Sequence, residues 1–157
     1  MSRRYKLVNV GSHVNPPGSM WADYAPAGYR DAAPRLTTKA FADGEYEILV
    51  VEGIEHRMLA QQLGLPREPM WARSFTDGPL GGRDPQARLE AQDQDHIDAE
   101  VILHPGFPEM LPKDRKIRYG MMRAFNSWLG EFCRHAPDRR VRVTAITQLC
   151  CGWGVNA

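Results

Sequence analysis

The sequence predicts an α/β fold in which helices cover a parallel sheet. Two observations support this prediction. Short β-prone runs alternate with segments of helical periodicity along the second half of the 157-residue chain, as in successive βα units. The β-prone runs are also largely continuous apolar stretches, which is typical of parallel strands buried on both faces.

The first predicted strand lies at the start of the chain. Residues 5–10, YKLVNV, form a β-rich run that ends at Gly11, so we expect a buried strand that feeds a loop. Residues 15–34 are dense in proline, glycine, alanine and aromatic residues. Because this segment is too rich in breakers for a long helix and too apolar for a disordered linker, we expect it to pack over the rest of the molecule.

A β-hairpin is predicted next. Two β-prone stretches flank the pair Asp43-Gly44, and glycine accepts the positive φ that a tight turn needs. Residues 53–65 are expected to form a short helix closed by Gly64. The following segment, 66–83, is predicted to be a loop.

The second half has the clearer signals. Asp84 is a predicted N-cap with Pro85 in the first helical position, and the helix is followed by the apolar strand AEVILH at 99–104. A second helix within residues 112–137 has apolar residues at three- and four-residue steps, namely Ile117, Met121, Phe125, Trp128 and Phe132. The run RVRVTAIT at 140–147 is predicted to be the third parallel strand.

Composition and charge exclude several classes of protein. With 43% hydrophobic residues, 25% charged residues and a net charge of +1, the chain has no electrostatic footprint for nucleic acid or an anionic membrane. No apolar run approaches the roughly twenty residues that span a bilayer, and the start MSRRYK is not followed by an apolar signal core. The three cysteines form no disulfide framework. We therefore expect a cytoplasmic protein without nucleic-acid or membrane partners.

Several blocks of the sequence together resemble a known family. The blocks are SHVNPPGSMW at 12–21, GYRDAAPRL at 28–36, GGRDPQARLEAQDQDHIDAEVILHPG at 81–106 and MRAFNSWLGEFCRHAPDRRVRVTAI at 122–146. In this order they resemble the amino-terminal part of the amidohydrolase-related (amidohydrolase 2) family, which includes aminocarboxymuconate semialdehyde decarboxylase. The resemblance implies the amino-terminal portion, about three βα steps, of a TIM (β/α)₈ barrel with an inserted β-hairpin. Residues 1–148 would be this partial barrel, and 149–157 a tail outside the family.

The resemblance also implies a metal position at the end of the first strand. In the family this strand ends with Asp, Glu or His, one spacer and His, so that alternate side chains reach a divalent ion, expected to be zinc. The matching triplet here is Gly11-Ser12-His13: His13 falls on a ligand position, Gly11 has no side chain to offer, and Ser12 is expected on the opposite face. Without the family, a lone histidine at a strand end is a hydrogen-bonded structural residue.

Three further residues are candidates for a substrate pocket. His104 ends the second predicted strand and would face the barrel mouth, while Asn15 and Trp21 lie in the loop after the first strand. The alternatives are a loop-entry histidine bonded to backbone for His104 and core packing for Trp21. His96 stands where the family commonly has glycine before the strand, so a strained turn is expected there.

Two functions follow from these observations. The resemblance implies a metal-dependent hydrolase or nonoxidative decarboxylase that acts on a small carboxylate or amide substrate. Gly11, and the absence of later strands that supply further ligands in the family, favour the alternative of a non-catalytic truncated or degenerate fragment. Such a fragment would self-associate as a homo-oligomer or need a complementing carboxyl-terminal barrel half. A self-contained small binding module is disfavoured because three parallel strands leave much apolar surface uncovered.

Overall fold

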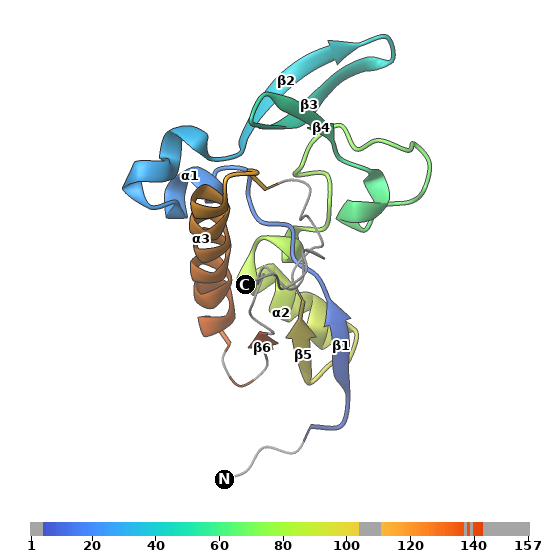
Figure 1. Ribbon diagram of the computed structural model, residues 1–157. Coiled ribbons are helices and arrows are strands. Elements are labelled where there is room, and N and C mark those ends of the chain that lie inside the picture. The colour runs from blue at the N-terminus through green and yellow to red at the C-terminus, as the bar shows by residue number, and fades with distance from the viewer. Residues whose placement is uncertain (1–4, 104–110, 137, 139, 143–157) are drawn as a thin grey trace, which may run out of the picture.

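The computed structural model describes residues 5–103, 111–136, 138 and 140–142, and it contains two separate three-stranded sheets with helices beside them (Figure 1). In chain order the elements are β1 (Val8–Ser12), α1 (Met20–Tyr24), the 3₁₀ helix η1 (Ala27–Ala32), β2 (Arg35–Phe41), β3 (Gly44–Val51), β4 (Ile54–Arg57), the 3₁₀ helices η2 (Ala60–Leu63) and η3 (Leu80–Gly82), α2 (Pro85–Gln94), β5 (Ala99–Ile102), α3 (Arg115–Arg134) and β6 (Arg140–Arg142).

The first sheet is parallel and has the strand order β1-β5-β6. Helix α2 precedes β5 and α3 precedes β6, so the predicted alternation of helices and parallel strands is confirmed. The expected burial of the first strand is wrong for Val8–Gly11, because β1 is an edge strand and these residues are exposed. The predicted third strand is seen over β6, and its continuation at 143–147 and the tail at 149–157 lie outside the described residues.

The second sheet is antiparallel, has the order β2-β3-β4 and projects away from the parallel sheet at the top of Figure 1. The hairpin predicted at Asp43-Gly44 is confirmed, with Gly44 at φ 130°. The predicted helix over 53–65 is wrong in its first half, where the chain forms strand β4. Glu52 and Gly53 both have positive φ, 50° and 79°, and this two-residue turn returns the chain alongside β3.

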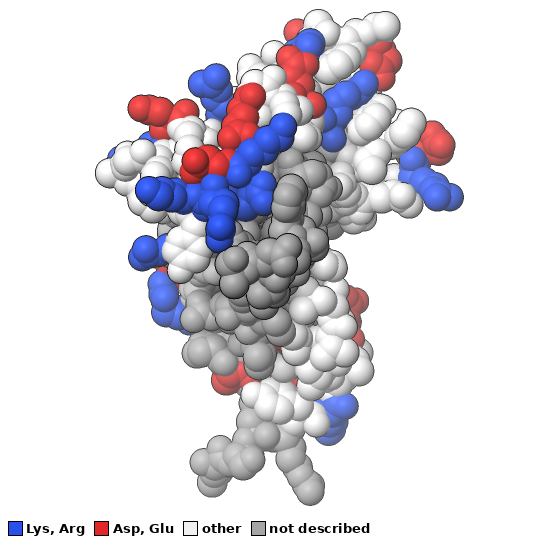
Figure 2. Space-filling view, viewed as in Figure 1, with Lys and Arg blue, Asp and Glu red and all other residues white. Residues whose placement is uncertain are grey.

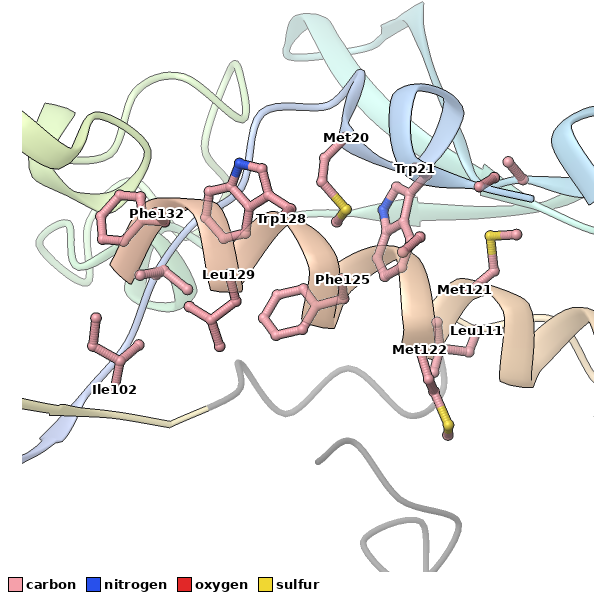
Figure 3. Close-up of a cluster of buried hydrophobic side chains, with 14 of the residues drawn as sticks. Met20, Trp21, Ile102, Leu111, Met121, Met122, Phe125, Trp128, Leu129 and Phe132 are labelled. Carbon is pink, nitrogen blue, oxygen red and sulfur yellow. The ribbon is translucent and has the colours of Figure 1, made fainter. Parts of the chain in front are cut away.

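Helix α3 supplies most of the main hydrophobic core. The Asp114 carboxylate caps its first turn, accepting hydrogen bonds from the Lys116 and Ile117 backbone N–H groups at 2.9 and 3.0 Å. The predicted apolar face is confirmed: it is buried at Met121, Phe125, Trp128 and Phe132, and partly buried at Ile117. Figure 3 shows Met20 and Trp21 of α1 lying against this face, with Ile102 of β5 near its other end. Burial of each large side chain contributes roughly 1.5–3 kcal/mol.

Helix α2 begins and ends as the sequence indicates. Asp84 caps it by accepting a hydrogen bond from the Ala87 N–H at 2.7 Å, and Pro85 occupies its first position. After the helix, His96 adopts the left-handed conformation with φ 56°, so the strained turn expected at this position is present. The Ile97 N–H then donates to the Gln92 carbonyl at 2.8 Å, which closes the helix end ahead of β5.

The surface carries both signs of charge. On the face shown in Figure 2, Lys and Arg side chains are interspersed with Asp and Glu, most densely in the upper part of the view. None of the helices within the described residues is both long enough and apolar enough to cross a membrane.

Candidate functional site

The candidate site lies at the carboxyl end of β1, where the strand passes into the loop that leads to α1. In sheets of parallel strands, ligands bind beyond the carboxyl ends of the strands. His13 and Asn15 come directly after β1, and the neighbouring strand β5 ends at Ile102 on the same side of the sheet. The predicted pocket residue His104 lies outside the described residues.

His13 is exposed at this end of the strand. Its backbone carbonyl accepts a hydrogen bond from Arg88 Nη1 at 3.3 Å. Within the described part of the chain no hydrogen bond to the imidazole ring occurs, and both the metal-ligand position and the structural histidine stay predictions for His13.

Gly11 interrupts the regular geometry of β1. Val10 pairs with Val101 of β5 and Ser12 pairs with Ile102, so Gly11 is an extra residue in a β-bulge and has φ 145°. The regular alternation assumed for Gly11-Ser12-His13 is therefore wrong at Gly11. A Cβ at Gly11 would meet no atom within 4 Å, so the conformation, and not space, disfavours a side chain at this position.

Ser12 belongs to a buried polar network. Its Oγ donates to Glu100 Oε2 at 2.7 Å, and Arg88 holds the same carboxylate through Nε–Oε1 and Nη2–Oε2 contacts of 2.8 and 2.7 Å. Glu100 is 2% exposed and the Arg88 side chain 17%. Such a two-pronged arginine–carboxylate contact compensates for the desolvation of the buried carboxylate. No local sequence pattern predicted this network, which joins β1, α2 and β5.

Asn15 ties the loop after β1 to the segment before α2. Its N–H donates to the Gly82 carbonyl at 2.8 Å. Its side chain packs so closely against Gly78 and Gly82 that a Cβ at either glycine would lie 3.2–3.3 Å from Asn15 Nδ2. The glycines at 78 and 82 therefore permit this approach, and they are the sequence signal that could have revealed it. The role of Asn15 in a substrate pocket stays a prediction.

Trp21 lies in the hydrophobic core. It is 7% exposed, and its ring centroid is 6.5 Å from that of Phe125 on α3 (Figure 3). The core packing that was the alternative for Trp21 is what the structure shows, and its role in a substrate pocket stays a prediction.

A second cluster of charged and aromatic side chains occurs on the antiparallel sheet. The Arg57 guanidinium lies over the rings of Phe41, Tyr46 and Trp71 at 4.4, 4.0 and 4.7 Å from their centroids. Asp43 accepts hydrogen bonds from the Tyr46 hydroxyl at 2.8 Å and from Arg57 at 3.2 Å. The hydrogen bond from Tyr46 is the main cause that lowers the pKa of Asp43. The chain's own arginine therefore occupies this aromatic cluster.

The residues at the end of β1 do not fit a catalytic metal site. Such a site usually needs three protein ligands. Within the described residues, no group of three or more His, Cys, Asp or Glu side chains is arranged to hold a metal ion. Next to His13, Gly11 supplies no ligand atom and Ser12 is turned into the network with Glu100.

Comparisons with known proteins show the fold. No protein-family model and no curated protein matches the sequence. Among solved structures, an amidohydrolase from Mycobacterium avium subsp. paratuberculosis K-10 matches with a TM-score of 0.61 at 15% sequence identity. The match covers 91% of this chain and 42% of that amidohydrolase, so the chain spans less than half of its length. The chain therefore has an amidohydrolase-like α/β fold, with a parallel sheet and an antiparallel hairpin sheet.

Proposed function

We propose that this chain corresponds to the amino-terminal part of a metal-dependent amidohydrolase-type enzyme, a hydrolase or nonoxidative decarboxylase of small carboxylate or amide substrates. The observation that carries the proposal is the exposed His13 at the carboxyl end of β1 in a fold that matches an amidohydrolase. This is where such a fold presents its reacting groups to a ligand.

By itself, we propose, the chain is not catalytic. One histidine beside a glycine supplies too few ligands for a zinc ion, which in catalytic sites has three protein ligands and an open position. The further ligands would come from a complementing carboxyl-terminal barrel half.

The exposed apolar residues of β1 support a requirement for such a partner. Leu7, Val8 and Val10 are 50, 43 and 75% exposed, and within the described residues β1 is an edge strand of its sheet. A free edge with apolar side chains is a surface on which strands add, and a closed barrel has no such edge. The second candidate, self-association through this same edge, is favoured by the same observation.

Elemental analysis of the purified chain tests the proposal. We expect much less than one zinc per chain, and any residual zinc unchanged in His13→Ala, because a single exposed histidine binds zinc weakly. One tightly held zinc per chain or per dimer that is lost in His13→Ala would contradict the proposal that the chain alone lacks a metal site.

A further inference from the structure

The bulge in β1 decides which face of the sheet His13 occupies. Successive side chains of a strand point to opposite faces. If the regular register continued after Val10, which is 75% exposed, then Ser12 would share the face of Val10. With Gly11 as an extra residue, Ser12 instead pairs with Ile102 and is buried on the side of α2, and the following residue, His13, is exposed.

A buried network fixes this placement of Ser12. The Glu100 carboxylate is 2% exposed. It accepts a hydrogen bond from the Ser12 hydroxyl at 2.7 Å and two from Arg88 nitrogens at 2.8 and 2.7 Å. A regular register would move the Ser12 hydroxyl to the other face and deprive a buried carboxylate of a donor, which is costly. Arg88 also binds the His13 carbonyl at 3.3 Å, and the Leu103 N–H binds the Ser12 carbonyl at 2.8 Å. The backbone that follows Gly11 is thus anchored at two successive carbonyls, those of Ser12 and His13.

The bulged register requires glycine at position 11. Its φ of 145° lies where residues with a side chain rarely occur, although space for a Cβ is present. The same register that exposes His13 therefore disfavours a ligand side chain at Gly11.

We propose that Ser12, Glu100 and Arg88 form a register lock: they hold the bulge at Gly11 and thereby place His13 on the face away from α2. They are positioning residues that act through the backbone of β1. Buried ion pairs add little net stability compared with apolar residues of similar size, but they can specify a register. The value of a correctly placed His13 rests on the proposed function, whereas the lock itself does not.

A double-mutant cycle tests the lock through the unfolding equilibrium measured in urea. In the wild-type background, Gly11→Ala is expected to raise the unfolding equilibrium constant by about tenfold or more, as for other strained positive-φ positions. In the background Arg88→Leu/Glu100→Leu, which replaces the ion pair with apolar residues of similar volume, β1 can adopt the regular register. There we expect Gly11→Ala to change the constant by less than about threefold.

Two other glycines provide matched controls, since a Cβ at either would also meet nothing within 4 Å. Gly53 has φ 79°, so Gly53→Ala should raise the unfolding equilibrium constant by the same factor in both backgrounds. Gly28 lacks a positive φ, so Gly28→Ala should be nearly neutral in both. The proposal would be overturned if Gly11→Ala raised the unfolding equilibrium constant by the same factor in both backgrounds.

A second readout follows His13 directly. In NMR spectra with a soluble paramagnetic agent, the His13 ring protons should be strongly broadened in the wild type and in Glu100→Gln, which keeps a side chain of the same shape for Ser12 and Arg88. The His13 ring protons should be broadened less in Arg88→Leu/Glu100→Leu.

The variant Ser12→Ala, which removes one hydrogen bond of the network, is used if the double variant does not fold. It should reduce both the effect of Gly11→Ala on the unfolding equilibrium constant and the broadening of the His13 ring protons. Unchanged values in Ser12→Ala would then overturn the proposal. Neither readout involves a metal, so a failure of the lock is distinguishable from a failure of the proposed function.

Discussion

Helices α2 and α3 occupy equivalent places in the chain, but different kinds of contact hold each of them against the rest of the molecule. Each is capped by an aspartate and each precedes a strand of the parallel sheet. Helix α3 buries an apolar face in the main core, whereas α2 buries only Gln92 among its ten residues and is joined to the sheet by the Arg88–Glu100 pair. Amphipathic periodicity therefore accounts for one helix and polar chemistry for the other.

The largest effect is expected where α3 enters the core. Phe125 is 1% exposed and packs between the rings of Trp21 and Trp128. Phe125→Ala should lower the free energy of unfolding by about 4 kcal/mol, because it removes apolar burial and leaves a cavity. Tyr119→Ala, at a position 61% exposed on the same helix, is the control and should change stability by less than about 0.5 kcal/mol. Similar losses in urea unfolding of the two variants would contradict the role given to α3.

The attachment of α2 predicts a different pattern. Glu100→Ala should lower the free energy of unfolding by about 3 kcal/mol, since it leaves the Arg88 guanidinium without its partner in a largely buried place. The double variant Arg88→Leu/Glu100→Leu should recover most of that loss, because it removes both charges. If the double variant is as unstable as the single one in urea unfolding, the pair supplies stability and not register.

A smaller effect, of opposite sign, is expected at Gln92. Its side-chain amide is buried, and neither amide atom has a hydrogen-bond partner within the described structure. Gln92→Leu should raise the free energy of unfolding by about 1 kcal/mol, because the cost of an unpaired buried amide disappears. Gln94→Leu, at an exposed position of the same helix, should give no gain in melting temperature. A loss of stability in Gln92→Leu would show that the amide has a structural role.

The ends of the two helices allow a further comparison. His96 follows α2 with φ 56°, while His135 caps α3 with φ −60°. His96→Gly should raise the free energy of unfolding by about 0.5 kcal/mol, because glycine adopts positive φ without strain. His135→Gly should give no gain. Thermal unfolding of both variants measures the difference in stability. Equal shifts in melting temperature would show that the positive φ of His96 is not the cause of the gain.

The smallest effect concerns pH and the contact of α1 with α3. The hydrogen bond from the Tyr24 hydroxyl to Glu131 is the main cause that raises the pKa of Tyr24 above its usual value near 10. Because the pKa is raised in the folded state, this stabilisation is fully present below about pH 10 and is lost as the pH rises through the folded pKa. Above pH 10 the free energy of unfolding should fall less in Tyr24→Phe than in the wild type. The same fall in both proteins, measured by urea titrations at several pH values, would contradict this assignment.

The sequence predicted the features that depend on local pattern. Helix α3, the Asp84 cap, the hairpin at Asp43-Gly44 and the strained turn at His96 follow from periodicity, caps and turn residues, or from the family resemblance, and the structure contains each of them. Strand β4 was missed because its turn uses Glu52-Gly53, a pair that carries a weaker hairpin signal than Asn-Gly or Asp-Gly.

The candidate site was predicted only in part. The sequence located His13 at the end of the first strand, and the structure places it there. The bulge was not predicted, because strict alternation was assumed through Gly11. The buried network was also missed, since Ser12 and Glu100 are 88 residues apart and no local pattern joins them.

Native-state hydrogen exchange tests most directly that a polar network, and not apolar burial, holds α2 and the end of β1. We expect the amides of α3 to exchange only with global unfolding, while those of α2 and the Leu103 amide bonded to Ser12 open at a lower free energy. We also expect Glu100→Ala to lower the protection of the α2 and Leu103 amides by more than it lowers that of α3. Equal protection of α2 and α3 in the wild type, falling equally in Glu100→Ala, would contradict the account.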